Sequence, residues 1–229
     1  MRIHYLQHVP FEGPAYLETI AHAGGASIAG TRLYEGEALP APSGFDLLAV
    51  MGGPMGVHDE RIYPWLAGEK RAIGEAIEAG KIVIGICLGA QLIADVMGAS
   101  VHKNEYREIG WFPVTRSSDA LSTGIDRLFP ERFQAFHWHG DTFDIPNGAV
   151  RLGESEACRN QGFVYDERIV ALQFHLEATP KSVRVLLDNC RDELDGSRFV
   201  QSEKDIANDT HFAECNGLFA HIMKSLGVL

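Results

Sequence analysis

Cys87 lies between two glycines in Gly85-Ile-Cys-Leu-Gly89, after an apolar run typical of a buried strand and before a run with helical spacing. A glycine-flanked turn between a strand and a helix is the arrangement of a nucleophile elbow, which holds the central side chain outward in a strained conformation. The N-terminus of the following helix would favour the thiolate form of this cysteine. The motif therefore indicates a nucleophilic thiol, although a cysteine that only packs in the core has the same local pattern.

A histidine and a glutamate stand two residues apart where a second apolar stretch ends, in Ala171-Leu-Gln-Phe-His-Leu-Glu177. Residues two apart on an extended chain point to the same side, so His175 and Glu177 can project together. A thiol nucleophile needs a base, and the base needs a third group that fixes its tautomer. Cys87, His175 and Glu177 supply these three groups, each at the end of a predicted strand. A single His-x-Glu is also common at strand ends with a structural role only.

A glycine-rich turn, Met51-Gly-Gly-Pro-Met-Gly56, follows another buried strand. Ligands of α/β sheets bind beyond the carboxyl ends of the strands, which is where this turn falls. Its glycines would let backbone amides approach a substrate, as an oxyanion hole requires, although Gly-Gly-Pro can also be a simple turn. The turn lacks the full G-x-G-x-x-G pattern of a dinucleotide site, and the sequence has no phosphate-binding P-loop.

The run His137-Trp-His139-Gly-Asp141 suggests a different chemistry, because an H-x-H-x-D sequence also begins the metal site of metallo-β-lactamase-type hydrolases. That signature continues with a further histidine, where this chain has Thr142. Zinc needs three or four ligands, and neither His102 nor His175 has a spacing that supplies the missing one. We therefore expect no metal and a strand end that shapes a pocket, with a zinc hydrolase as a distant alternative.

These residues must be positioned by elements that change in character along the chain. The first half alternates apolar runs with helical patterns, which favours a largely parallel sheet with helices on both faces. The second half alternates mostly like strands, which suggests an antiparallel extension of the same sheet. Thr179 as N-cap and Pro180 in the first turn mark a later helix. The expected strands cover 2–6, 26–34, 45–51, 82–86, 101–115, 132–143, 149–153 and 161–174, and the expected helices cover 15–23, 65–79, 88–97, 180–194 and 204–226.

Composition narrows the class of protein. The chain has 229 residues, of which 45% are hydrophobic, enough for one α/β domain. We expect a domain over residues 1–195 and a helical extension, 196–229, packed on it. A formal net charge of −11 without a basic cluster argues against nucleic acid or an anionic membrane as partner. Four scattered cysteines and the absence of a signal-peptide pattern or an uninterrupted apolar span indicate a cytoplasmic protein.

Four motifs taken together resemble a class I glutamine amidotransferase domain, a family with a Cys-His-Glu triad. They are Met51-Gly-Gly-Pro-Met55, Gly85-Ile-Cys-Leu-Gly-Ala-Gln91, His139-Gly-Asp141 and Gln173-Phe-His-Leu-Glu177, in the family's order. The segment Glu108-Ile-Gly-Trp-Phe-Pro-Val114 is similar to the stand-alone, GMP-synthetase-like branch. The resemblance implies a flavodoxin-like, three-layer α/β/α fold with a central, mostly parallel sheet and an antiparallel extension.

Carried over residue by residue, the resemblance implies Cys87 as nucleophile, His175 as base and Glu177 as the group that orients it. The amides of Gly53 and Leu88 would form the oxyanion hole. The residues implied in substrate binding are Gln91, His139, Gly140 and Asp141. The family commonly has proline where this chain has Leu176, a difference that leaves both flanking triad members in place.

The chemistry that the resemblance implies is hydrolysis of the γ-amide of glutamine to glutamate and ammonia through a γ-glutamyl thioester, without a cofactor. The sequence has no second domain for ATP-dependent amination, so we expect either a separate ammonia-accepting synthetase subunit or a free-standing hydrolase. A γ-glutamyl hydrolase or peptidase acting on larger γ-glutamyl amides is the close alternative. A non-catalytic regulatory subunit is a distant alternative that an intact triad argues against. The sequence leaves open whether the tail over 204–226 pairs with another subunit in a homo-oligomer.

Overall fold

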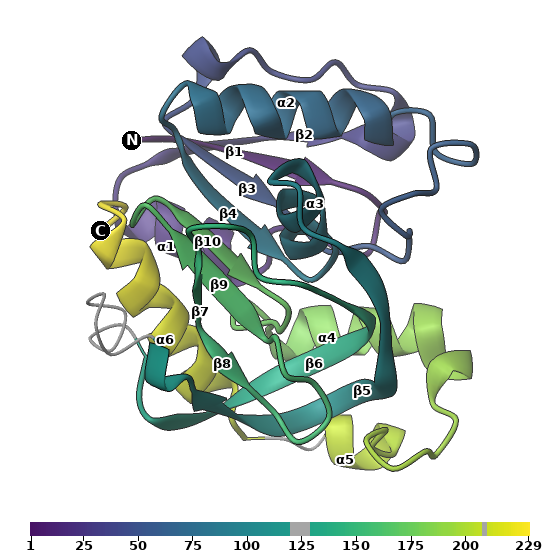
Figure 1. Cartoon of the computed structure of the whole chain (residues 1–229). Coiled ribbons are helices and arrows are strands. Elements are labelled where there is room, and N and C mark those ends of the chain that lie inside the picture. Colours follow the sequence, from purple (N-terminus) through teal and green to yellow (C-terminus); the bar gives the residue numbers. More distant parts are fainter. Residues whose placement is uncertain (120–128, 208–209) are drawn as a thin grey trace.

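The computed structural model describes residues 1–119, 129–207 and 210–229 and has the predicted α/β architecture (Figure 1). In this part of the chain the strands form a seven-stranded sheet and a separate three-stranded sheet. The neighbours from β2 to β10 in the larger sheet pair in parallel, whereas β9 and β7 are antiparallel additions. Its strands, in spatial order, are β2 (Ser27–Arg32), β1 (Arg2–Gln7), β3 (Leu47–Val50), β4 (Ile82–Ile86), β10 (Ile169–Leu172), β9 (Gly162–Tyr165) and β7 (Val150–Arg151).

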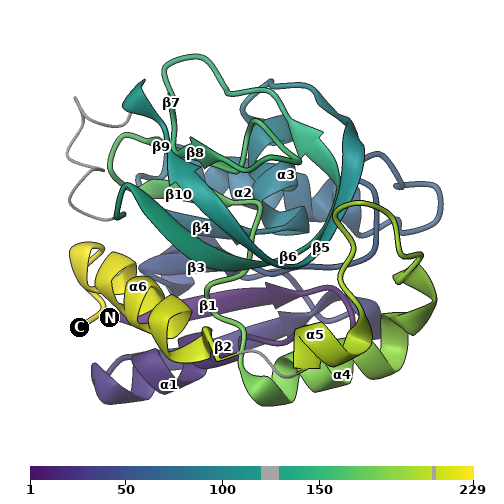
Figure 2. The same ribbon diagram turned by 90° about the horizontal axis from the view of Figure 1, so that it is seen from below.

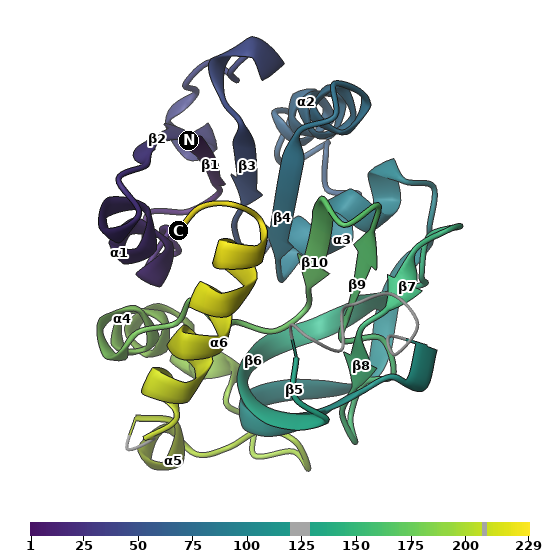
Figure 3. The same cartoon turned by 90° about the vertical axis from the view of Figure 1, so that its left-hand side faces the viewer.

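Helices cover both faces of the larger sheet, as the continuous apolar runs of its central strands require (Figure 3). Along β4, Val83 packs into the core under one layer of helices, while Ile84 and Ile86 pack into the core under the other. The first layer consists of α2 (Leu66–Glu78) and α3 (Leu88–Val96), and the second contains α1 (Tyr16–Ala23), α4 (Pro180–Cys190) and α6 (Phe212–Ser225). The predicted three-layer arrangement is confirmed.

The antiparallel part differs from the expectation of one extended sheet. The two longest of the late strands leave the central sheet and, with one short strand, form a second sheet from β6 (Arg132–Phe143), β5 (Val101–Arg116) and β8 (Gly153–Glu154). The segment 161–174, expected as one strand, is a β9–β10 hairpin, because Asp166 and Glu167 adopt positive φ angles of 50° and 54° in its turn. Among the described residues, β9 and β7 are the antiparallel strands that extend the central sheet.

Helices from the end of the chain cover the second sheet (Figure 2). Trp111 of β5 contacts Phe212 edge to face at 4.8 Å and donates its indole N–H to the carbonyl of Ile206, 3.2 Å away. The last helical region is two helices, α5 (Glu203–Ala207) and α6, rather than one; residues 208–209 lie outside the described residues. Short 3₁₀ turns complete the elements at Leu33–Glu35, Pro42–Gly44 and Arg191–Glu193.

The last helix also holds the segment that carries His175 and Glu177. The amide of Asn216 in α6 donates hydrogen bonds of 2.9 Å to the carbonyls of both Leu176 and Ala178, which are buried. The N–H of Tyr16 donates to the carbonyl of Glu177 at 3.0 Å. Helices from both ends of the chain therefore fix the backbone that follows β10.

Replacing Asn216 by leucine is expected to lower the free energy of unfolding by about 2 kcal/mol, because two buried carbonyls lose their donor. Urea unfolding measures the effect. Asn189→Leu is the matched control, since the Asn189 amide donates to the carbonyl of Val185 within α4, on its exposed side. Equal losses in the two variants would show that the Asn216 contacts do not hold this segment.

A bilayer-crossing helix, which would have to be long and apolar, is not found among the described residues.

Candidate active site

Cys87 lies at the junction of β4 and α3 in a backbone conformation that side chains rarely adopt, with φ 53° and ψ −109°. Close packing explains the flanking glycines. A Cβ on Gly89 would overlap the carbonyl oxygen of Val50, and one on Gly85 would lie 2.6 Å from the backbone of Gly89. Helix α3 therefore approaches the sheet closely enough to keep the turn sharp. The turn holds the thiol 3.5 Å from the carbonyl oxygen of Trp138, at the wall of a pocket.

His175 reaches Cys87 because the strands that precede them are parallel neighbours. Leu172 of β10 pairs with Ile86 of β4, and the N–H of Cys87 donates to the carbonyl of Leu172 at 2.8 Å. The backbone N–H of His175 donates to the carbonyl oxygen of Phe136, in the second sheet, at 2.8 Å. This bond turns the chain toward the thiol.

The imidazole of His175 is placed between the thiol and a carboxylate. Its Nδ1 lies 2.7 Å from Oε1 of Glu177, and its ring is close enough to the Cys87 thiol for that group to raise its pKa. Burial alone would lower the pKa of His175. The charge of Glu177, the hydrogen bond to Glu177 and the interaction with Cys87 outweigh burial and raise this pKa well above its usual value. The arrangement favours an imidazolium that is oriented by Glu177.

The Gly52-Gly53 turn follows β3 and faces the same pocket. Gly53 is tightly enclosed, since a Cβ there would lie 2.9 Å from the Cβ of His8. His8 is fully buried, with Nδ1 2.8 Å from the Gly52 carbonyl oxygen and Nε2 2.8 Å from Oε1 of the equally buried Glu69. Because a peptide unit is planar and trans, a donor that fixes the Gly52 carbonyl also fixes the direction of the Gly53 N–H. The His8–Glu69 pair therefore orients one of the two amides expected in the oxyanion hole.

Leu88 is the first residue of α3, and the first amides of a helix have no acceptor within the helix. Because Leu88 is the residue directly after Cys87, its free N–H is available to an oxygen of a substrate bound at the thiol.

The pocket at Cys87 has a volume of about 310 Å³ and is lined by six of the residues named from the sequence, Gly53, Cys87, Gln91, His139, Gly140 and Asp141. His175 and Glu177 line a smaller cavity next to it. The amide of Gln91 lines the Cys87 pocket and donates to Oε1 of Gln173 at 3.1 Å. The Asp141 carboxylate pairs with the Lys103 ammonium at 2.7 Å. The lining residues of the Cys87 pocket are Glu12, Gly53, Pro54, Met55, Cys87, Gln91, Lys103, Arg107, Trp138, His139, Gly140, Asp141, Leu186, Cys190 and Glu193.

Glu12 adds a carboxylate to the site that none of the sequence motifs contains. The side chain leans over Gly52, where a Cβ would collide with it, and borders both the Cys87 pocket and a smaller cavity beyond His175. Burial raises the pKa of Glu12, and the nearby His175 and His8 oppose this effect. The only signal in the sequence was the position of Glu12 shortly after the first strand.

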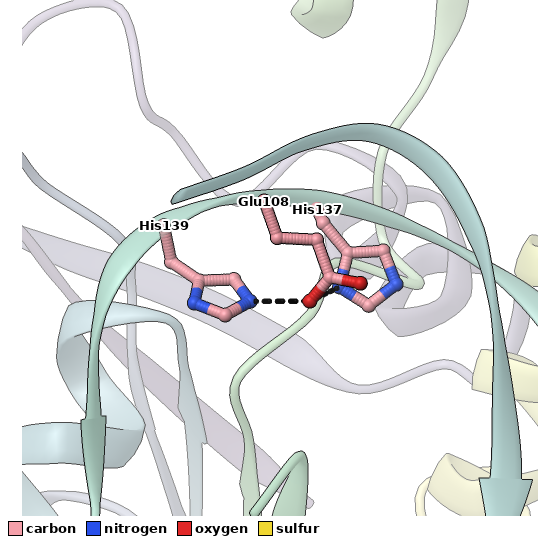
Figure 4. A group of neighbouring side chains, drawn as sticks. All are labelled: Glu108, His137 and His139. Atoms are coloured by element: carbon pink, nitrogen blue, oxygen red, sulfur yellow. Dashed lines mark hydrogen bonds and ion pairs between the residues drawn. The ribbon is translucent and has the colours of Figure 1, made fainter. Parts of the chain in front are cut away.

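The two histidines of the H-x-H-x-D run do converge, but with Glu108 of the neighbouring strand instead of Asp141 (Figure 4). Oε2 of Glu108 lies 3.4 Å from Nδ1 of His137 and 3.2 Å from Nε2 of His139. Burial lowers the pKa of His137 to about 4. Burial alone would raise the pKa of Glu108, but the facing imidazoles and the hydroxyl of Ser155 lower it to about 2.

Comparisons with known proteins point to one family. The family model described as glutamine amidotransferase class-I matches residues 18–191. The glutamine amidotransferase-like protein YfeJ of Salmonella typhimurium is 36% identical over 210 residues, which cover 88% of this chain and 87% of that protein. A GMP synthase (glutamine-hydrolyzing) of Yarrowia lipolytica is 32% identical over 132 residues, so the match covers 56% of this chain but only 23% of that enzyme.

Solved structures of glutamine amidotransferases match almost the whole chain. The crystal structure of a glutamine amidotransferase from Thermotoga maritima superposes with a TM-score of 0.90 at 33% identity, covering 99% of this chain and 97% of that one. A glutamine amidotransferase from Methylobacillus flagellatus gives a TM-score of 0.92 at 30% identity, covering 98% and 93%. The chain therefore belongs to the class I glutamine amidotransferase family.

Proposed function

We propose that this chain hydrolyses the γ-amide of glutamine to glutamate and ammonia, with Cys87 as nucleophile, His175 as acid and base, and Glu177 as the group that orients His175. The observation that carries the proposal is the position of the His175 imidazole. It lies 2.7 Å from the Glu177 carboxylate and interacts with the Cys87 thiol closely enough that both groups raise its pKa. This is the arrangement that activates a thiol for attack on an acyl carbon.

In the first step the Cys87 thiolate attacks the side-chain amide carbon of glutamine. The negative charge that develops on the amide oxygen is stabilised by the N–H groups of Gly53 and Leu88. His175, held protonated by Glu177, then gives its proton to the leaving nitrogen, and the carbon–nitrogen bond breaks as ammonia departs.

In the second step the γ-glutamyl thioester is hydrolysed. The now neutral His175 takes a proton from water, and the hydroxide attacks the thioester carbon. Breakdown returns the thiolate of Cys87 and the imidazolium of His175, so the cycle closes without an additional acid or base.

The size and charge of the pocket support free glutamine over a larger γ-glutamyl amide. A volume of about 310 Å³ is at the lower end for ligand pockets, and suits a single amino acid. The lining offers carboxylates from Glu12 and Asp141 and cations from Lys103 and Arg107. Groups of both signs complement the ammonium and the carboxylate of a zwitterionic amino acid.

The test is ammonia and glutamate release by the purified chain, with kcat/KM measured for glutamine and for a panel of γ-glutamyl amides of increasing size. Glutamine is expected to be the best substrate. A larger γ-glutamyl amide with a higher kcat/KM would replace the proposal by a γ-glutamyl hydrolase. Zinc-dependent hydrolysis would instead survive iodoacetamide and fail with a chelator.

Ammonia released at Cys87 needs an acceptor if the reaction is biosynthetic. Because GMP synthases match this chain over about a quarter of their length, we propose that a separate synthetase subunit could take the ammonia. Glutamine turnover that increases when a cell extract is added would support such a partner, and turnover that is already maximal with the chain alone would contradict it.

Replacing Glu177 by glutamine is expected to move the basic limb of the pH–rate profile to lower pH by about one unit or more. The Glu177 carboxylate raises the pKa of His175, so its loss lowers that pKa. The imidazolium needed to protonate the leaving nitrogen is then lost at a lower pH. Glu18→Gln on the exposed side of α1 is the control, and a basic limb unchanged in Glu177→Gln would contradict the role of Glu177.

A further inference from the structure

The reaction proposed above leaves one buried group of ionisable side chains unused: Glu108, His137 and His139, here called the Glu-His-His cluster (Figure 4). These residues are 1%, 0% and 5% exposed. They come from paired strands, with Glu108 of β5 directly opposite His139 of β6. His137 lies two residues earlier on β6, so its side chain points to the same side of the sheet.

Hydrogen bonds outside the cluster define which nitrogen of each ring faces inward. Nε2 of His137 lies 3.2 Å from the carbonyl oxygen of Phe112, and Nδ1 of His139 lies 3.1 Å from that of Asp141. A carbonyl can only accept, so in a neutral imidazole these nitrogens carry the N–H. The other nitrogens, Nδ1 of His137 and Nε2 of His139, then direct lone pairs toward Glu108.

That arrangement lacks positive charge. Two imidazole lone pairs face a carboxylate oxygen at 3.4 Å and 3.2 Å without a hydrogen between them, which is repulsive in a buried site. Nδ1 of His137 and Oε1 of Glu108 have no hydrogen-bond partner within the described residues, although both are fully buried. A cation at this point would satisfy all of these atoms together.

The donor atoms match the needs of a transition-metal ion. One ligand atom from each residue lies within 4.8 Å of the others. Ligands about 2.1 Å from a tetrahedral zinc ion are about 3.4 Å from one another, close to the distances from Glu108 to both rings. Neutral imidazole and an ionised carboxylate are the forms that bind metal, and Oε1 of Glu108 offers a fourth donor atom.

The surroundings also resemble the outer shell of a metal site. Metal-binding histidines usually donate their second N–H to a carbonyl or carboxylate, as both rings do here. The Glu108 carboxylate accepts hydrogen bonds from Nε2 of Gln161 at 2.6 Å and from the hydroxyl of Ser155 at 3.1 Å. These contacts hold the Oε2 atom that also faces both rings and leave Oε1 without a partner among the described residues.

We propose that Glu108, His137 and His139 bind one divalent transition-metal ion of the zinc type, which joins β5 to β6 behind the pocket wall. The three ligands are buried, so we assign the ion a structural role and no part in the thiol reaction. Because His139 also borders the Cys87 pocket, the ion would hold the wall formed by His139 and Gly140 in place.

The test is the metal content of the full chain, purified without a chelator and with any affinity tag removed. We expect about one metal ion per chain in the wild type and less than about one tenth of that in Glu108→Gln and His137→Phe. Phenylalanine suits the volume at position 137, which lies between Phe112 and Phe174. His102→Asn is the control, because His102 lies on the same strand, is exposed, and is outside the cluster.

A second measurement does not depend on the variants. Chelator-treated wild type is titrated with Co²⁺, and uptake of one ion with the visible absorption of a nitrogen- and oxygen-ligated cobalt is expected, along with a rise in Tm. The proposal is overturned if the wild type carries no metal and takes up neither Zn²⁺ nor Co²⁺. In that case protons, not a metal, balance the cluster. Equal metal content in the wild type and in folded cluster variants would also overturn it.

Discussion

Replacing Cys87 by alanine is expected to reduce ammonia release from glutamine by about 10⁵–10⁶-fold, the effect of removing a nucleophile from a catalytic triad. The loss is this large because neither His175 nor the oxyanion hole can form the thioester. The fold is expected to remain, since alanine is smaller than cysteine and the strained turn depends on close packing at Gly85 and Gly89. Ammonia release in single-turnover and steady-state assays measures the loss, and circular dichroism checks the fold.

A second thiol in the same pocket provides a sharp control. Cys190 also lines the pocket, but burial and nearby carboxylates raise its pKa to about 12, so it is not ionised at neutral pH. Iodoacetamide is expected to label Cys87 and to inactivate the protein, and labelling of Cys190 is expected to be slower. Wild-type activity in Cys87→Ala, or inactivation that follows the labelling of Cys190, would show that Cys87 is not the nucleophile.

The parts of the site that the sequence predicts share one property, which is their position in short motifs at strand ends. Cys87 and the Gly52-Gly53 turn follow apolar runs, and His175 and Glu177 stand two residues apart after a third run. In an α/β sheet such ends gather at one edge, so local sequence is enough to bring them together. The parallel order of β1, β3, β4 and β10 is the structural reason.

Other contacts could not be predicted, because they join single residues across long stretches of chain. The buried hydrogen bonds from His8 to Gly52 and to Glu69 are one example, because none of these residues belongs to a motif that predicts the contact. Glu108 meets His139 only through the register of β5 and β6, which shifts between Lys103 and Glu108. A shift of one residue would have moved Glu108 to the other face of the sheet, so no spacing rule could identify it. Asp141 had the expected spacing but pairs with Lys103.

Replacing His8 by alanine is expected to lower kcat by about 10²-fold while KM changes little, because the Gly53 amide acts on the charge that appears only in the transition state. His8 bonds to the Gly52 carbonyl and is itself held by Glu69. Burial alone would lower the pKa of His8, but the Glu69 charge and the hydrogen bonds to Glu69 and Gly52 raise it. A positively charged donor on this carbonyl fixes the peptide unit firmly, so that the Gly53 N–H does not need to reorient as the oxyanion forms.

The split between kcat and KM distinguishes this positioning role from a general loss of stability. His4→Ala is the matched control, because His4 lies on β1, the strand that ends directly before His8, and bonds to the hydroxyl of Thr31. Glu69→Gln keeps an acceptor for His8 and removes only the charge, so a smaller fall in kcat is expected than in His8→Ala. If His8→Ala folds and keeps the wild-type kcat, the Gly53 amide is oriented without His8. If KM rises as much as kcat falls, the pair shapes the substrate site instead of the oxyanion hole.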